Sequence, residues 1–237
     1  MTSPHQQRAL ITGASSGIGR ATALAFAKAG IDLALVGRSE KTLQPVVQEA
    51  QALGVKAQTY SIDLARVEQV AYRIAEIGSV DILVNNAGIG YTAALFDMPL
   101  ADWQSVLTLN LTSPLQCIQA VLPSMRVCGQ GTIINVVSIG GRQVFSQWGA
   151  YCSSKFGLMA LTKTLALEER AHGIRVMAIC PGAVNTSLWD NPDVDADFDR
   201  EAMLSPDDVA QAILGAVQLP QHAVIEELVL MPNVGTF

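Results

Sequence analysis

Short apolar runs rich in Val, Ile and Leu alternate along the chain with longer segments whose apolar residues recur at helical spacing. The runs predict seven strands, near residues 9–12, 32–37, 56–62, 82–85, 132–138, 175–180 and 227–231. The segments between them predict helices near residues 18–30, 40–53, 66–77, 100–128, 152–172 and 206–218. Strands alternating with helices indicate βαβ crossovers. We therefore expect an α/β fold, a doubly wound parallel sheet of about seven strands with helices on both faces.

Nothing in the pattern divides the chain into parts, because no linker rich in Gly, Ser or Pro and no internal repeat interrupts it. We expect a single domain over residues 1–237. Residues 139–149 and 186–204 depart from the alternation, and the second stretch carries six acidic residues and one arginine. It follows a strand, at the edge where open α/β sheets bind ligands. We predict a mobile substrate lid at 186–204, and an ordinary surface excursion is the alternative.

Composition excludes several classes of protein. Half of the 237 residues are apolar, 15% are charged and the mean hydropathy is +0.31, so the chain is neither disordered nor fibrous. The net charge of −6 gives no basic surface for nucleic acid. No run of 18 apolar residues and no signal peptide is present, which predicts a cytoplasmic protein without a membrane partner.

The four cysteines are scattered and form no CxxC motif, and no histidines cluster at metal-ligand spacing. They are Cys117, Cys128, Cys152 and Cys180. We expect no metal site and no disulfide framework, which fits a reducing compartment.

A glycine-rich segment, TGASSGIG from Thr12 to Gly19, joins the first predicted strand to the first predicted helix. Glycines here let backbone N–H groups approach a pyrophosphate, and the helix N-terminus favours an anion. Tight turns also use glycine for steric reasons alone, so the segment by itself is a weak signal. Its place after the first strand of a βαβ unit favours a dinucleotide site.

This segment resembles the TGxxxGxG motif of the short-chain dehydrogenase/reductase family. The resemblance continues in family order through Asn85-Asn86-Ala87-Gly88, Asn110, Ser138, Tyr151-x3-Lys155 and Pro181-Gly182. It covers residues 8 to about 231, which is essentially the whole chain. It implies a Rossmann-type domain and an oxidoreductase that transfers a hydride between a nicotinamide cofactor and a carbonyl or alcohol.

The residues after the second strand bear on the choice of nicotinamide cofactor. NAD enzymes usually place an acidic residue there to bind the adenine-ribose 2′-hydroxyl, whereas this chain has Arg38 and Ser39. A guanidinium binds a phosphate through its planar fork. We therefore expect NADP(H) rather than NAD(H), and a solvated loop arginine is the alternative.

The resemblance implies the remaining cofactor contacts. Asp63 and Leu64 hold the adenine, although an Asp at a strand end also serves as a helix N-cap. Residues 86–88 line the ribose and stabilise the central sheet, and residues 181–186 orient the nicotinamide carboxamide. The expected cofactor-binding residues are Gly13, Ser15, Ser16, Gly17, Ile18, Gly19, Arg38, Ser39, Asp63, Leu64, Asn86, Ala87, Gly88, Tyr151, Lys155, Pro181, Gly182, Val184 and Thr186.

Tyr151 and Lys155 are four residues apart on a predicted helix and therefore share one face. Carbonyl reduction needs a proton donor, and a nearby ammonium is expected to lower the tyrosine pKa toward neutral pH. The resemblance implies that Lys155 binds the nicotinamide ribose hydroxyls and that Ser138 donates a hydrogen bond to the substrate oxygen. It also implies that Asn110 holds a water that links the lysine to solvent. Taken singly, each residue also has an ordinary surface or turn role. The predicted catalytic group is Asn110, Ser138, Tyr151 and Lys155.

Substrate contacts are expected from residues 139–149, from residues 89–98 and from the lid with Leu188 and Trp189. These segments are apolar and aromatic with few cations, which favours a neutral ketone or aldehyde, with a 3-oxoacyl thioester second. An alcohol or sugar dehydrogenase acting oxidatively and a non-catalytic dinucleotide-binding regulator remain as alternatives. The helices at 100–128 and 152–172 are apolar on more than one face, which predicts a homodimer or homotetramer.

Overall fold

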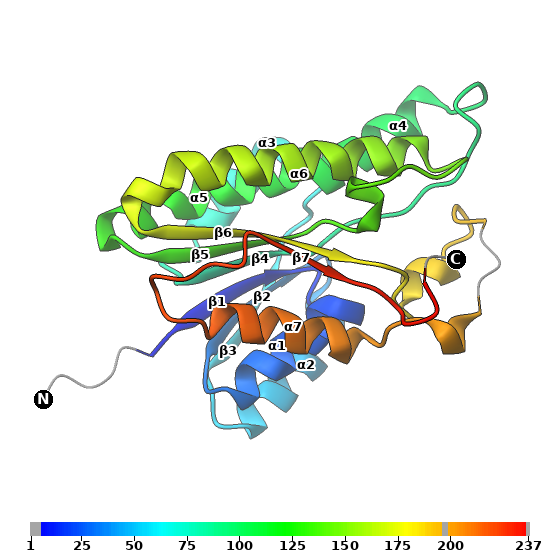
Figure 1. Ribbon diagram of the computed structural model, residues 1–237. Coiled ribbons are helices and arrows are strands. Elements are labelled where there is room, and N and C mark those ends of the chain that lie inside the picture. The colour runs from blue at the N-terminus through cyan, green and yellow to red at the C-terminus, as the bar shows by residue number, and fades with distance from the viewer. Residues whose placement is uncertain (1–5, 196–198, 236–237) are drawn as a thin grey trace, which may run out of the picture.

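The computed structural model describes residues 6–195 and 199–235, and residues 196–198 of the predicted lid lie outside the described residues. Its centre is a seven-stranded parallel sheet with the order β3-β2-β1-β4-β5-β6-β7, as the alternating pattern predicts (Figure 1). The strands are β1 (Arg8–Thr12), β2 (Asp32–Gly37), β3 (Ala57–Ser61), β4 (Ile82–Asn85), β5 (Gly131–Val136), β6 (Ile174–Pro181) and β7 (Glu227–Leu230). From β1 the chain adds β2 and then β3 on one side of the sheet, and it then crosses to the other side of β1, where it adds β4 through β7 in order. That reversal creates a crevice at the carboxyl ends of β1 and β4.

Helices cover both faces of the sheet (Figure 1). One face carries α1 (Gly17–Lys28), α2 (Glu40–Ala52) and α7 (Pro206–Val217), and the other carries α3 (Val67–Ala75), α5 (Ser113–Cys128) and α6 (Gly149–Glu169). Two apolar cores result, one on each side of the strands. Central strands such as β5 are buried at every residue, which explains why their sequences are mostly apolar. No helix among the described residues is both long and apolar enough to span a bilayer.

The single helix predicted over residues 100–128 is wrong. The structure divides it into α4 (Leu100–Leu107), a π-helical turn η1 (Thr108–Thr112) and α5. Pro114 has no N–H with which to bond the carbonyl of Asn110, so the regular helical ladder cannot pass this point. The hydroxyl of Ser113 donates instead to the carbonyl of Thr108, five residues earlier, at 3.0 Å. The widened turn places Asn110 in the interior, fully buried.

Two other boundaries differ from the prediction in ways that affect the site. β5 ends at Val136, so Ser138 lies beyond the strand, in a left-handed backbone conformation with φ 149°. The predicted loop at residues 139–149 begins with a 3₁₀ turn, η2 (Ile139–Gly141), and α6 already starts at Gly149. Tyr151 therefore lies in the first turn of α6.

Candidate active site

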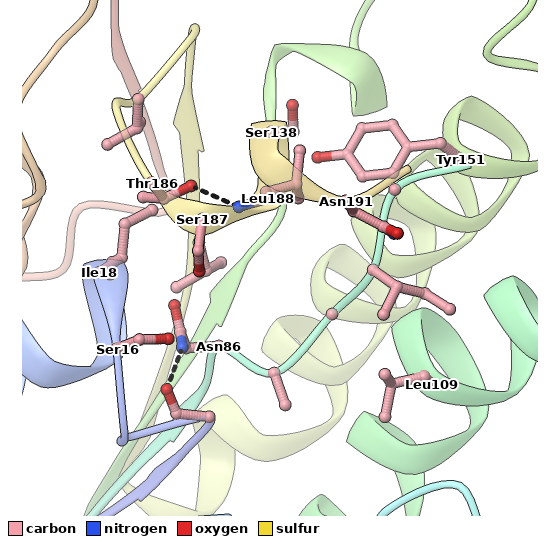
Figure 2. A pocket seen from close by; sticks show the side chains of 18 of the residues that line it. Ser16, Ile18, Asn86, Leu109, Ser138, Tyr151, Thr186, Ser187, Leu188 and Asn191 are labelled. Atoms are coloured by element: carbon pink, nitrogen blue, oxygen red, sulfur yellow. Dashed lines mark hydrogen bonds between the residues drawn. The ribbon is translucent and has the colours of Figure 1, made fainter. Parts of the chain in front are cut away.

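A cavity of about 680 Å³ opens at the carboxyl ends of the central strands. It runs from the loop after β1 to the loops that follow β5 and β6. Figure 2 shows Ser16, Ile18 and Asn86 at one end and Ser138, Tyr151, Leu188 and Asn191 at the other. The cavity thus joins the predicted phosphate-binding segment to the predicted catalytic group.

The phosphate end has the form of an anion cradle. Gly13 turns the chain at φ +65°, and a Cβ at that position would lie 2.9 Å from the Asn86 amide and 3.0 Å from the Ala87 backbone. The α1 N-terminus carries no side-chain cap and no acidic residue in its first turn, and its first residues, Gly17 and Ile18, line the cavity. These features fit the pyrophosphate of a dinucleotide, because helix N-termini bind anions through free N–H groups.

Thr12 and Asn86 join the ends of β1 and β4 beside this cradle. The Thr12 hydroxyl oxygen accepts from the backbone N–H of Asn86 at 3.0 Å and of Ala87 at 3.1 Å. The Asn86 amide donates back to the Thr12 carbonyl at 3.0 Å. These bonds connect the segment after β4 to the end of β1.

At the adenine end, Arg38 and Asp63 line both the main cavity and a neighbouring hollow of about 230 Å³. Asp63 accepts from the backbone N–H of Ala65 at 3.1 Å and lies 3.6 Å from the Arg66 guanidinium. The N-cap of α3 is Arg66, so the alternative that Asp63 caps this helix is wrong. Its carboxylate forms a local turn and faces the cavity.

Tyr151 and Lys155 lie on the buried face of α6, with the ammonium 5.7 Å from the centre of the tyrosine ring. The Lys155 ammonium donates to the Val136 carbonyl at 3.0 Å. Burial raises the pKa of Tyr151 to about 12, partly offset by a hydrogen bond with the Ser138 hydroxyl, and lowers the pKa of Lys155 to about 8. The expected lowering of the tyrosine pKa by the ammonium is therefore not found for the protein alone, because desolvation raises this pKa by more than the hydrogen bond with Ser138 lowers it.

Ser138 is held beside Tyr151 in an unusual backbone conformation. A non-glycine residue at φ 149° is strained, and such strain persists only where surrounding contacts fix it. The Ser138 hydroxyl oxygen accepts from the Gly140 N–H at 3.0 Å, and the Ser138 carbonyl accepts from the Gly141 N–H at 3.0 Å. These bonds close η2 and leave the hydroxyl facing Tyr151 (Figure 2).

Asn110 supports the catalytic helix from behind. Its amide exchanges two hydrogen bonds of 2.9 Å with the backbone of Ile89 and donates to the Ser154 hydroxyl at 3.1 Å. Ser154 in turn donates to the Tyr151 carbonyl at 2.7 Å. Asn110 thereby connects η1, the segment after β4 and the first turn of α6.

The structure brings most of the predicted residues together around one cavity. Those that line it are Gly13, Ser15, Ser16, Gly17, Ile18, Arg38, Asp63, Leu64, Asn86, Ala87, Gly88, Ser138, Tyr151, Lys155, Pro181, Gly182, Val184 and Thr186. Three of the predicted cofactor-binding and catalytic residues are not part of the lining, and of the predicted substrate segment 89–98 only Ile89 and Gly90 are. Gly19 packs against Gly13 and Asn86, Ser39 is the N-cap of α2, and Asn110 lies behind the wall.

Phe145, Trp148 and Asn191 also line the cavity. They lie in segments 139–149 and 186–204, from which substrate contacts are expected, although the sequence analysis named none of the three individually. Trp148 lies three residues before Tyr151, a spacing that places two side chains on one helical face, and this was the available signal. Phe145 and Asn191 lie in loops, where periodicity gives no signal. Among the described residues, no group of three or more His, Cys, Asp or Glu side chains is placed to hold a metal.

Comparison with known proteins agrees with this geometry. The short chain dehydrogenase family matches residues 7–196. The chain is 34% identical to a sepiapterin reductase from Chlorobaculum tepidum over 95% of this chain and 96% of that protein. It is 36% identical to a 3-oxoacyl-[acyl-carrier-protein] reductase from Thermotoga maritima over 86% of this chain and 87% of that protein.

Solved structures show the same fold. An alcohol dehydrogenase from the archaeon Thermococcus sibiricus, complexed with 5-hydroxy-NADP, is 30% identical and superimposes with a TM-score of 0.88. The match covers 97% of each chain.

Proposed function

Because the chain belongs to the short-chain dehydrogenase family and is an oxidoreductase, we propose that it reduces a ketone or aldehyde to an alcohol with NADPH, with Tyr151 as the general acid. The arrangement of Ser138, Tyr151 and Lys155 at one end of a cavity with a phosphate cradle at the other carries this proposal. When bound, the dinucleotide supplies the hydride.

The protein's own residues supply the proton and the orientation. A carbonyl oxygen between the hydroxyls of Ser138 and Tyr151 receives two hydrogen bonds, and the Tyr151 proton passes to that oxygen as negative charge develops on it. Lys155, 5.7 Å from the ring centre, stabilises the tyrosinate left behind. Tyr151 holds its proton at neutral pH, since its pKa is raised to about 12, and the protonated form is the one that a general acid needs.

Arg38 supports NADP(H) as the cofactor. It faces the adenine end of the cavity, and its guanidinium suits a 2′-phosphate, whereas an acidic residue here would repel one. The structural relative complexed with 5-hydroxy-NADP adds support by analogy.

The alternatives differ in what they need. A 3-oxoacyl thioester reductase is the second candidate, because a relative 36% identical is named for that activity. An alcohol or sugar dehydrogenase uses the same residues in reverse. A non-catalytic regulator needs none of them, so the assembled Ser138, Tyr151 and Lys155 weigh against it.

We also propose a reducing, cytoplasmic setting and a homo-oligomeric enzyme. All four cysteines are free thiols in the structure, and Cys117, Cys152 and Cys180 are buried. The outer face of α6 exposes large apolar side chains that a second copy would cover.

The first test is thermal unfolding with NADPH and with NADH. A ligand at 100 times its Kd adds about 2.7 kcal/mol of stability, which raises the midpoint visibly. We expect NADPH to shift the midpoint more than NADH, and Arg38→Asp to weaken NADPH while sparing NADH. A shift with NADH alone would overturn the cofactor assignment. No shift with either would overturn the enzyme assignment itself.

A further inference from the structure

The substrate end of the cavity is walled by aromatic rings. Phe145 and Trp148 come from the loop before α6, and Trp189 comes from the 3₁₀ turn η4 (Ser187–Asp190) of the predicted lid. The Trp148 ring meets the Tyr151 ring edge to face, with centroids 5.3 Å apart, and meets the Trp189 ring the same way at 5.9 Å. The rings therefore extend directly from the general acid to the lid.

This wall is fixed in position. The Trp189 indole N–H donates to the Val184 carbonyl at 2.8 Å. Thr92 donates its backbone N–H to the Asp193 carbonyl at 2.9 Å, and its hydroxyl oxygen accepts from the Asp195 N–H at 2.8 Å. A Cβ on Gly90 would lie 3.3 Å from the Trp148 ring and 3.4 Å from the Leu188 side chain, so this glycine lets the lid and the wall approach each other.

The base of the lid is tied by Arg200. Its guanidinium donates to the Asn185 side-chain oxygen at 2.8 Å and to the Thr186 carbonyl at 3.0 Å, and forms an ion pair with Asp190 at 3.0 Å. Hydrogen bonds therefore hold the lid segment on both sides of Trp189. Arg200 is the single basic residue of the lid sequence, and it bonds to other residues at the base of the lid and is not part of the cavity lining.

Charge is absent where the substrate would lie. Segments 89–90, 138–151 and 187–191 contribute no charged side chain to the lining among the described residues. The polar lid residues that line the cavity with a side-chain hydroxyl or amide are Thr186, Ser187 and Asn191 (Figure 2). Lys155 is buried behind Tyr151 and is bonded to Val136. A carboxylate or phosphate on the substrate would lose its hydration without gaining a cation, which is costly in a cavity of this kind.

We propose that Trp148 and Trp189 form an aromatic wall that makes the enzyme selective for neutral carbonyl compounds with a flat aromatic group beside the carbonyl. Aromatic rings favour edge-to-face and offset stacked contacts with further rings, and three such side chains surround this space. The inference rests on the proposed function, because it presupposes that a carbonyl is reduced next to Tyr151.

Three keto compounds separate charge from ring recognition. Methyl benzoylformate carries the ring and no charge, benzoylformate carries the ring and a carboxylate, and methyl pyruvate carries neither ring nor charge. We expect kcat/KM with NADPH to be at least about 100-fold higher for methyl benzoylformate than for benzoylformate. We also expect methyl benzoylformate to exceed methyl pyruvate by about tenfold or more.

The wall itself is tested by Trp189→Ala, with Trp189→Phe as the conservative variant and Trp103→Phe as the matched control. Trp103 lies on α4 and is not part of the cavity lining. Trp189→Ala should remove most of the preference for methyl benzoylformate over methyl pyruvate, mainly through KM, while Trp189→Phe and Trp103→Phe retain it. The ratio of two substrates on one enzyme is unaffected by a loss of active protein.

Each outcome decides the proposal. Equal or faster reduction of benzoylformate, or an unchanged substrate ratio in Trp189→Ala, overturns the aromatic wall. A protein that binds NADPH in the unfolding assay but reduces none of the three compounds also overturns it. A protein that binds neither cofactor instead refutes the proposed function.

Discussion

Burial shifts the pKa values of Tyr151 and Lys155 in the directions that favour their neutral forms. The tyrosine pKa is raised to about 12, so the side chain keeps its proton over the physiological range, as the proposed role of general acid requires. The lysine pKa is lowered to about 8, so part of its charge depends on solution pH. A buried pair of this kind is typical of groups tuned for proton transfer.

Tyr151→Phe removes the proton donor and little else, since the ring and its contact with Trp148 are kept. Turnover is expected to fall by roughly 10²–10⁴, the usual contribution of general acid catalysis. Steady-state kinetics with a saturating carbonyl substrate measures this, and the NADPH Kd serves as the control. Turnover close to that of the wild type in a folded variant would contradict the assignment.

Lys155 should also make the free energy of unfolding depend on pH. Below pH 8 the folded and unfolded proteins both carry the ammonium, so folding includes the full cost of burying it. Between pH 8 and the ordinary lysine value of 10.5, the folded protein loses the proton while the unfolded chain keeps it, and the cost falls as pH rises. The lysine therefore disfavours the folded state most at low pH.

The measurement is the difference in Tm between the wild type and Lys155→Met across this range. The wild type should gain on the variant by several degrees from pH 7.5 to 10, since 1 kcal/mol shifts Tm by about 2–4 °C in a chain of this size. The lost bond to Val136 adds an offset that does not change with pH. Lys41→Met, at an exposed position on α2, should show no such trend. A Tm difference between the wild type and Lys155→Met that does not change with pH would contradict a buried ammonium at Lys155.

At the scale of elements, the order of strands and helices was predictable because each strand is a short apolar run and each helix keeps a helical spacing of apolar residues. The strands at 32–37 and 82–85 agree residue for residue with β2 and β4. The π-helical turn η1 was not predictable by periodicity, since it depends on Pro114 and on the bonds of Asn110 to a distant segment. The position of Ser138 beyond β5 likewise depends on η2, which long-range contacts fix.

One of those contacts is an ion-pair cluster that joins β7, α6 and the residue after η2. The Glu227 carboxylate lies 3.0 Å from the Arg142 guanidinium and 3.1 Å from the Lys163 ammonium. Arg142 directly follows η2, so this cluster anchors the turn that holds Ser138. β7 is thereby connected to the turn that carries Ser138, a relation that no local sequence motif contains.

Glu227→Gln should loosen η2 and misplace Ser138. A fall in kcat of roughly 3- to 30-fold is expected, because small displacements of a positioning group are costly, while NADPH affinity stays unchanged. Arg142→Gln should have a similar effect, and the double variant should be little worse than either single one, since both changes break one interaction. Additive losses in this double-mutant cycle would show that the two residues act independently, and would exclude their ion pair as the contact that positions η2.

At the scale of the whole molecule, the catalytic helix also forms part of the outer surface. Phe156 and Leu167 on α6 have exposed fractions of 41% and 72%, and their spacing of 11 residues is close to three full turns. They therefore lie along one face, on the side of the sheet that also carries α3 and α5 (Figure 1). The opposite face of the same helix positions Tyr151 and Lys155, so α6 is shared between the site and a surface suited to a second copy.

Replacing both Phe156 and Leu167 with Glu should therefore convert the proposed homo-oligomer to a monomer. A pair of α6 helices brings each Glu against an apolar stripe of the other copy, and burying an unpaired carboxylate there is strongly unfavourable. Light scattering on the eluting protein should then give a mass near 25.1 kDa, whereas the wild type gives a multiple of it. Tyr72→Glu, on the exposed face of α3 with 67% of its side chain accessible, is the matched control and should leave the assembly intact. A wild type that is already monomeric, or a double variant that stays assembled, would exclude this face of α6 as the interface.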